Sequence, residues 1–120
     1  MSFSQLPVVD LEAINNLRSL GDEGDDTFLR EIITIYLEDT PLRIADLKKS
    51  FHDGDKALFT RSAHTIKGSS ANVGSSRVRS IAEQIEQRSK VEPIAGLADL
   101  IKELDQAYAE ASKRLASYQV

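Results

Sequence analysis

Apolar side chains recur every three or four positions along almost the whole chain, which is the spacing of α-helices that bury one face. A first stretch of this kind lies between Asp10 and Gly21, where the aspartate can cap a helix and the glycine can end it. A second stretch follows the acidic loop 22–26 and is apolar around much of its circumference. Such a helix is expected at the centre of the fold.

Proline, glycine and small polar residues separate the remaining stretches. Thr40-Pro41 has the form of a cap followed by proline at the first helical position, so a third helix is predicted from there to Asp53-Gly54. A fourth helix is predicted over about 55–73, and a fifth begins at residue 75 or 76. The last and longest helix is predicted over about 93–118. No segment alternates with a period of two for long enough to predict a strand.

The last predicted helix carries an apolar stripe along its whole length. Its members are Ile94, Leu97, Ile101, Leu104, Tyr108, Ala111, Leu115 and Tyr118. Packing within a bundle explains this stripe better than a dimeric coiled coil, because the other helices also need a partner for their apolar faces. The prediction is therefore an all-α fold, an antiparallel four-helix bundle with one or two short additional N-terminal helices. We expect a single domain over 1–120 and a monomer.

Composition narrows the class of protein without identifying it. The chain has 120 residues, of which 41% are hydrophobic and 28% charged, as is typical of one globular domain. It contains no cysteine, so disulfides and thiolate metal sites are excluded. The net charge of −4 and the pI near 5.1 argue against nucleic acid as the main partner. Short apolar runs and an N-terminus without signal-peptide features predict a cytoplasmic protein that does not enter the membrane.

The most informative residue is His64, in the fourth predicted helix. At about 100° per residue, the aromatic and aliphatic residues of this helix gather on one side, and His64 lies roughly opposite them. Lys67 and Gly68 follow at i+3 and i+4, so both lie beside the imidazole. By spacing alone, a histidine in such a position is most often a solvent-facing polar residue. Other features must decide its role.

Two features favour a functional role for His64. Gly68 lies in mid-helix, where glycine costs about 1 kcal/mol relative to alanine, and no role in the core explains it. The residues around His64 carry positive charge in a chain whose net charge is negative, which points to an anion at this place. An exposed imidazole is a good nucleophile near neutral pH, and a neighbouring ammonium can offset the charge of a phosphate. The pattern therefore indicates a histidine that accepts a phosphoryl group.

The run from His64 to Ser70, His-x-x-Lys-Gly-Ser-Ser, resembles the signature of histidine-containing phosphotransfer (HPt) domains, and Gly74 ends the helix as in that family. The resemblance implies a phosphorelay intermediate of two-component signal transduction. His64 would take a phosphoryl group, at Nε2, from an aspartate of a receiver domain or from a hybrid sensor histidine kinase. It would pass the group to an aspartate of a response regulator. The resemblance implies no kinase activity and no cofactor, because the receiver domain supplies Mg²⁺ and most catalytic groups.

The resemblance also assigns roles to three further residues. Lys67 would lie near the phosphate, and Gly68 would give clearance to the phosphoryl group and to the partner's active site. A polar residue on the next helix often accepts a hydrogen bond from the other imidazole nitrogen, and by its offset from His64 this residue is Glu86. Two interpretations of Glu86 stay open, an orienting acceptor or a solvated surface carboxylate. The sequence does not indicate the partners or the direction of phosphoryl flow, and Met1 and the compact length favour a free-standing protein.

Three other functions compete with this one. A general-base enzyme needs a concave pocket and a second catalytic group, and no spacing in the chain supports either. A metal site is disfavoured because His52, the only other histidine, lies twelve positions upstream, whereas zinc needs three or four clustered ligands. A non-catalytic helical adaptor that binds receiver domains without phosphotransfer is the serious alternative. The presence of His64, Lys67 and Gly68 together argues against it.

Overall fold

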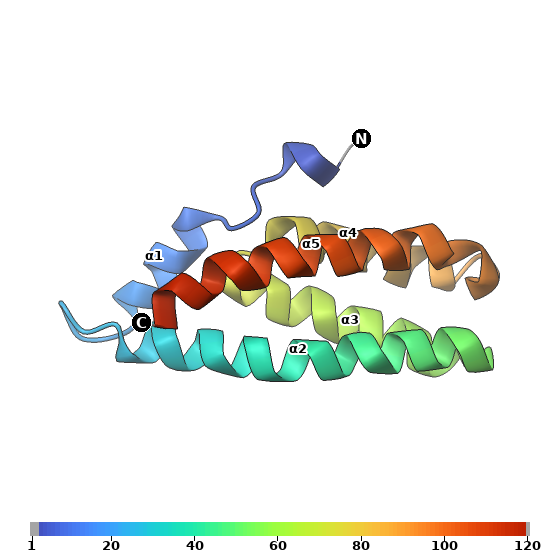
Figure 1. Ribbon diagram of the computed structural model, residues 1–120, viewed down its shortest axis with the longest axis horizontal. Helices are drawn as coiled ribbons and strands as arrows, with labels where there is room; N and C mark the ends of the chain where they lie inside the picture. Colours follow the sequence, from blue (N-terminus) through green and yellow to red (C-terminus); the bar gives the residue numbers. More distant parts are fainter. Residues whose placement is uncertain (1–2, 120) are drawn as a thin grey trace.

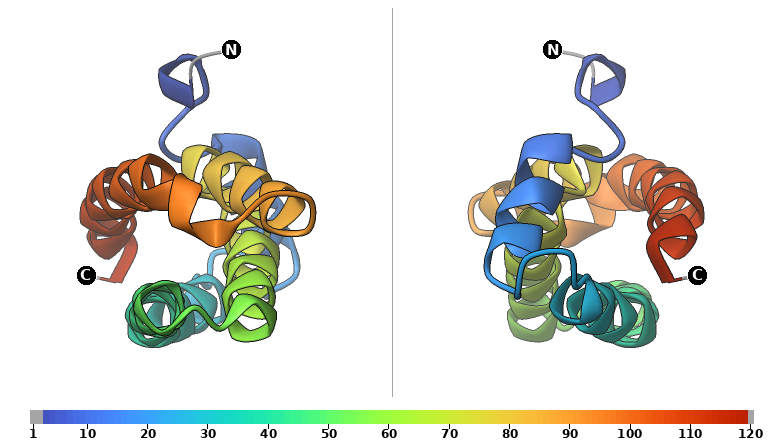
Figure 2. Two further views of the ribbon diagram at one scale, coloured as in Figure 1. Left: turned by 90° about the vertical axis from the view of Figure 1, so that its right-hand side faces the viewer. Right: turned by 90° about the vertical axis from the view of Figure 1, so that its left-hand side faces the viewer.

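The computed structural model describes residues 3–119, and every regular element within them is helical. Four long helices lie lengthwise beside one another, and a short helix lies at one end of them (Figure 1). The bounds are α1 Leu11–Ser19, α2 Thr27–Asp53, α3 Lys56–Val73, α4 Ser76–Ser89 and α5 Ala98–Ala116, with 3-10 turns at Phe3–Gln5, Ile94–Leu97 and Ser117–Gln119. Seen end-on, α2, α3, α4 and α5 surround a common core (Figure 2). The predicted four-helix bundle with a short N-terminal helix is confirmed.

Capping residues and glycines set the ends of the helix that carries His64. The Asp55 carboxylate accepts a hydrogen bond from the backbone N–H of Leu58 at 3.1 Å, which caps the start of α3. Gly54 and Gly74 follow α2 and α3 with φ of 72° and 75°, the left-handed conformation that favours glycine. These short turns reverse the chain, so α2, α3 and α4 run antiparallel (Figure 1).

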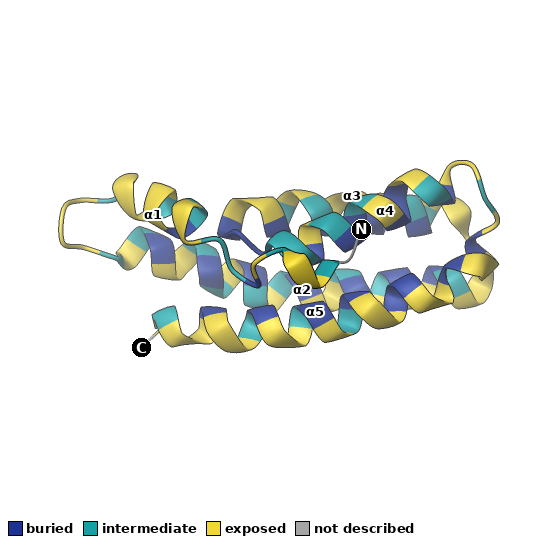
Figure 3. Ribbon diagram, turned by 90° about the horizontal axis from the view of Figure 1, so that it is seen from above, coloured by how far each residue is buried: buried dark blue, intermediate teal, exposed yellow. Residues whose placement is uncertain are grey.

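Buried residues line the inner faces of the long helices, and exposed residues face outward (Figure 3). The largest fully buried side chains come from every helix and include Ile14, Leu29, Ile33, Leu47, Phe59, Ile66, Ile81, Ile85, Leu104 and Leu115. The apolar stripe of the last predicted helix is buried, except that Tyr108 and Tyr118 are partly exposed while packing against the core. Packing of this stripe within the bundle is therefore confirmed.

The predicted helix break at Thr40-Pro41 is wrong, because α2 continues through both residues to Asp53. Proline in a helix interior removes one backbone hydrogen bond and costs about 3 kcal/mol. Against that cost, Tyr36, Ile44 and Leu47 are buried on both sides of the proline, whereas Pro41 itself is exposed. An uninterrupted helix keeps all of these side chains on the bundle. Tertiary packing therefore outweighs the local signal.

The last predicted helix, over about 93–118, consists of three consecutive elements. It begins with the 3-10 turn Ile94–Leu97, continues as α5 over Ala98–Ala116 and ends in a second 3-10 turn. Pro93 has an extended backbone, with ψ of 134°, so the helix starts after it and its first turn is tight. The boundaries therefore differ at both ends, while the face that packs on the bundle is the predicted one.

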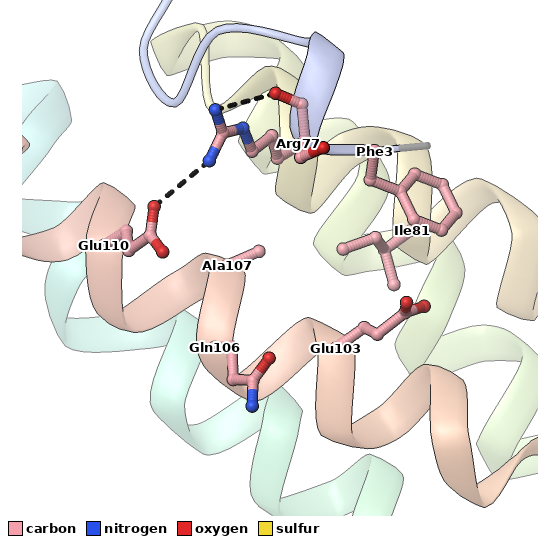
Figure 4. A pocket seen from close by; sticks show the side chains of 8 residues that line it. Phe3, Arg77, Ile81, Glu103, Gln106, Ala107 and Glu110 are labelled. Atoms are coloured by element: carbon pink, nitrogen blue, oxygen red, sulfur yellow. Dashed lines mark hydrogen bonds and ion pairs between the residues drawn. The ribbon is translucent and has the colours of Figure 1, made fainter. Parts of the chain in front are cut away.

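Arg77 of α4 ties the segment before α1 to the bundle. Its guanidinium donates hydrogen bonds to the backbone carbonyls of Leu6 at 2.6 Å and Ser4 at 3.0 Å, and to the Glu110 carboxylate at 3.1 Å. These contacts lie beside a pocket of about 270 Å³ between Phe3 and the helices α4 and α5 (Figure 4). None of the residues that line this pocket belongs to the predicted site. Within residues 3–119, no helix has the length and apolar character needed to cross a membrane.

Gly74 should tolerate substitution far less than Gly54, although both have a positive φ. A Cβ at Gly74 would lie 2.8 Å from the carbonyl oxygen of Asp10 and 2.9 Å from the Cβ of Ala13, whereas at Gly54 it would meet nothing within 4 Å. We expect Gly54→Ala to lower the free energy of unfolding by about 1 kcal/mol, from the left-handed conformation alone. Gly74→Ala should lower it by about 3 kcal/mol, because backbone must also shift. Urea unfolding measures both losses, and equal losses would contradict this account.

Candidate functional site

His64 lies in the middle of α3 with its imidazole directed away from the core. The opposite face of this helix is buried and consists of Phe59, Ser62, Ala63, Ile66, Ser70 and Val73. The His64 side chain is 64% exposed, so it makes little contact with the packed interior. The structure thus confirms which face of the helix is buried and which carries the histidine.

Glu86 of α4 holds the imidazole from one side. Its Oε2 lies 2.7 Å from Nδ1 of His64, and its Oε1 lies 2.7 Å from Nζ of Lys67. The residue is only 6% exposed, so the interpretation of Glu86 as a solvated surface carboxylate is wrong. One buried carboxylate therefore bridges the histidine and the lysine that are neighbours on α3.

The charge of Glu86 decides which nitrogen of His64 carries a proton. Burial raises the pKa of the Glu86 carboxyl, but hydrogen bonds and charges from Lys67 and His64 outweigh burial, and the pKa lies below its ordinary value of 4.5. At neutral pH the carboxylate can only accept hydrogen bonds, so Nδ1 must donate. In the neutral imidazole, Nε2 then keeps its lone pair. This nitrogen lies on the side of the ring away from Glu86.

Gly68, one turn after His64, is exposed, and a Cβ placed on it would meet nothing within 4 Å. No contact within the described part of the chain therefore requires a glycine at this position. The helix would be more stable with alanine by about 1 kcal/mol. The absence of a side chain leaves the space next to the imidazole open to a group that approaches from outside.

The residue that the sequence interpretation missed is Lys90, which follows the last residue of α4. Its Nζ lies 3.7 Å from Glu86 Oε2, the same oxygen that contacts His64. The signal was present in the sequence, because residues four apart on a helix are neighbours and a glutamate four positions before a lysine is a favourable pair. The site therefore holds two lysines, one on α3 and one directly after the end of α4.

Hydrogen bonds between α3 and α4 fix the Glu86 side of the site. The hydroxyl oxygens of Thr60 and Ser89 lie 2.7 Å apart, and Ser89 also donates to the backbone carbonyl of Glu86 at 2.7 Å. Ser89 is fully buried, so its bond to the Glu86 carbonyl is shielded from water. Glu86 is therefore held at a constant position relative to the helix that carries His64.

An apolar surface lies between α2 and α3 close to this site. Ile32 and Ile35 of α2 line a pocket of about 140 Å³ together with Ser69 and Asn72 of α3. Ile35 is exposed, and Asn72 lies one turn after Gly68 on the same side of α3. The apolar surface therefore continues from the face that carries His64. Exposed apolar groups next to a reactive side chain are typical of surfaces that bind another protein.

The lowered pKa of Glu86 predicts a specific loss of stability in acid. Because the folded pKa lies below the ordinary value of 4.5, the ionised carboxylate stabilises the fold above that pH, and this contribution is lost as the pH falls through the folded pKa. We expect the free energy of unfolding of the wild type to fall, relative to that of Glu86→Gln, as the pH falls below about 4.5 and through the lowered pKa of Glu86. Urea unfolding of both proteins at several pH values measures this difference. The contributions of the other carboxyl groups cancel, because both proteins contain them. A difference that does not change with pH would contradict the prediction.

The family of this protein follows from comparison with known sequences. Residues 31–113 match the family model described as Hpt domain, which covers more than half of the chain. The protein belongs to the Hpt domain family. Its class is that of the phosphorelay intermediates of two-component signal transduction.

Individual relatives are distant in sequence and similar in fold. Multistep phosphorelay regulator 1 of Schizosaccharomyces pombe is 27% identical over 96 residues, which make up 80% of this chain and 32% of that protein. Histidine-containing phosphotransfer protein 2 of Arabidopsis thaliana is 22% identical over 107 residues, 87% of this chain and 69% of that protein. The chain thus spans about a third of the yeast relative and about two thirds of the plant relative.

Solved structures show the same fold. The crystal structure of histidine-containing phosphotransfer protein B from Pseudomonas aeruginosa superposes with a TM-score of 0.85 at 17% identity, over 94% of this chain and 95% of that chain. The HPT domain of a sensor hybrid histidine kinase from Shewanella superposes with a TM-score of 0.76 at 15% identity, over 92% of each chain. The helical bundle is therefore common to proteins that have few identical residues.

Proposed function

We propose that His64 is the phosphoacceptor of this domain. It takes a phosphoryl group from an aspartate of a receiver domain, or from a hybrid sensor histidine kinase, and passes it to an aspartate of a response regulator. The observation that carries the proposal is the exposed imidazole whose Nδ1 lies 2.7 Å from the buried carboxylate of Glu86. This contact fixes the tautomer and leaves Nε2 as a nucleophile on the open face of α3.

One bond forms and one breaks at phosphorus in each transfer. The lone pair of Nε2 attacks the phosphorus of the partner's aspartyl phosphate, and the bond from phosphorus to the aspartate oxygen breaks with its electron pair leaving on the carboxylate. Nδ1 keeps its proton, so the phosphorylated ring is positively charged, and the Glu86 carboxylate stabilises that charge. In the second transfer, an aspartate carboxylate of the next partner attacks phosphorus, and the N–P electrons return to Nε2.

In this proposal, Lys67 offsets the charge of the phosphoryl group and Gly68 leaves room for it. Lys67 lies one turn from His64, and its flexible stem lets the ammonium turn toward a phosphoryl group on Nε2 and offset its charge. Gly68 leaves room for that group and for the active site of the partner. The open space around Gly68 and the position of both residues beside His64 support these roles.

The domain is a carrier without kinase activity and without a cofactor of its own in this proposal. Mg²⁺ would be held by the receiver domain, where it would supply positive charge to the transferring phosphoryl group. Within residues 3–119, no three His, Cys, Asp or Glu side chains are grouped in a way that could hold a metal ion. The burial of the α5 stripe supports a monomer, and the net charge of −4 supports protein rather than nucleic acid as partner. We place the protein in the cytoplasm, away from the membrane.

Receiver domains dock, in this proposal, on the face that joins His64 to the apolar surface at Ile35. The face crosses α3 at Gly68 and Asn72, where side chains are absent or short. A receiver that covers this face would bury Ile35 and bring its aspartate to the imidazole. Apolar burial would then supply affinity, while the chemistry depends on the groups around His64.

A reconstituted transfer assay tests the proposal. Receiver domains are loaded with phosphoryl groups by acetyl phosphate and Mg²⁺, mixed with the purified protein, and the modified residue is mapped by mass spectrometry. We expect acid-labile, base-stable phosphorylation on His64 with at least one receiver. Phosphorylation at another residue would refute the assignment of the acceptor. Binding without phosphorylation, with every receiver tried, would favour a non-catalytic adaptor.

A further inference from the structure

Glu86 contacts two lysines in addition to His64. Lys67 Nζ lies 2.7 Å from Oε1, and Lys90 Nζ lies 3.7 Å from Oε2. Two ammonium groups, one from α3 and one from the end of α4, therefore share a single buried carboxylate. A buried carboxylate needs a counter-ion at all times, because an uncompensated buried charge is strongly destabilising.

We propose that Lys90 is a positioning residue for phosphotransfer, which takes the place of Lys67 beside Glu86 when Lys67 turns to the phosphoryl group on His64. The inference rests on the proposed function of His64. Glu86 lies at the Nδ1 edge of the imidazole, whereas the phosphoryl group would lie at the Nε2 edge. In this proposal, Lys67 turns from Glu86 toward the phosphoryl oxygens at the other edge of the ring.

The count of charges supports this exchange. Before transfer, one carboxylate faces two ammonium groups. A phosphoryl group adds roughly 1.5 to 2 negative charges. Phosphorylation also makes the ring of His64 positively charged, so the carboxylate and the phosphoryl group then face three cations, the ring, Lys67 and Lys90, and the charges nearly balance. Without Lys90, the site would keep roughly one unbalanced negative charge.

Lys90 has the freedom that such an exchange demands. Its side chain is 59% exposed, compared with 29% for Lys67 and 8% for Glu86. A movement of about 1 Å (3.7 Å less 2.7 Å) would give Lys90 the distance that Lys67 now has. Its backbone is held at the end of α4, because its N–H donates a hydrogen bond to the carbonyl oxygen of Gln87 at 3.3 Å. The side chain can therefore move without a change in the helix.

Phosphoramidate, a small phosphoryl donor that needs no receiver domain, allows a direct test on the full chain. The rate of His64 phosphorylation is followed by mass spectrometry in the wild type and in three lysine variants. We expect Lys90→Ala to lower this rate about fivefold, as befits a partly exposed ion pair. Lys90→Arg should restore most of the rate, because it keeps the charge. Lys113→Ala, near the C-terminal end of α5, should leave it unchanged.

The Glu86→Gln background decides how Lys90 acts. Glutamine keeps an oxygen that can accept from Nδ1 of His64, but it carries no charge that needs a counter-ion. Lys90→Ala should therefore have no further effect in this background. Equal losses in both backgrounds would mean that Lys90 acts on the donor directly, and they would overturn the inference, as would an unchanged rate in Lys90→Ala alone. A wild type that is phosphorylated neither by phosphoramidate nor by receivers would instead refute the proposed function of His64.

Discussion

His64→Gln is expected to abolish phosphorylation of the protein while leaving its fold intact. Glutamine has no ring nitrogen that can attack phosphorus, so no base-stable phosphoryl group should form with any donor. Stability should change by no more than about 0.5 kcal/mol, because the side chain is 64% exposed and contributes little to the core. The amide can still donate to Glu86, which also keeps Lys67 and Lys90 as partners.

His52→Gln is the matched control for this variant. His52 is the only other histidine of the chain and lies exposed in the last turn of α2. Its replacement should leave phosphorylation unchanged. The measurement is phosphoryl transfer from a loaded receiver domain, combined with circular dichroism to show that both variants are folded. Persistent base-stable phosphorylation of His64→Gln would refute the acceptor assignment.

Gly68→Gln is expected to slow phosphotransfer about a hundredfold, while making the protein slightly more stable. A side chain at this position projects into the space beside the imidazole, so a receiver could no longer bring its aspartate into line, and small misplacements of reacting groups have effects of this size. Stability should rise by about 0.5 kcal/mol, since glutamine is a better helix former than glycine and a Cβ meets nothing within 4 Å. Gly68→Ala should be more stable still, by about 1 kcal/mol, with a smaller loss of transfer.

Ala109→Gln serves as the control for added bulk on a helix surface. Ala109 is exposed on α5, and its replacement should not change transfer. Stopped-flow or quench measurements of transfer, alongside urea unfolding, separate the two effects. If Gly68→Gln transferred as fast as the wild type, clearance would not be the reason for glycine here. A large loss of stability in Gly68→Gln would also contradict the account, because it would reveal an internal contact.

The face of the site was readable from sequence because it depends on local periodicity. A helix places residues three and four apart side by side, so His64, Lys67 and Gly68 had to be neighbours once α3 was recognised. The contact of Glu86 was different, since it depends on how α3 and α4 pack. From the sequence alone, Glu86 could equally be a buried partner of His64 or a solvated carboxylate. Only the 2.7 Å contact with Nδ1 decides between these two interpretations.

Local signals were least reliable where packing opposed them. Thr40-Pro41 is a sound helix start by local rules, yet α2 continues through it because buried side chains lie on both sides of the proline. Lys90 shows the opposite case, a local i, i+4 pair that was visible but had no meaning until Glu86 was known to be buried beside His64.

By itself, the sequence of this protein determined a helical bundle and a histidine on the outer face of one helix, because both follow from the spacing of apolar residues within single helices. The tertiary structure alone decided how the imidazole is held and how the site is charged. Those properties arise where α3 meets α4, with Glu86 buried between His64, Lys67 and Lys90. No pattern within one helix encodes the distance between groups on two helices, which the packing of the core sets.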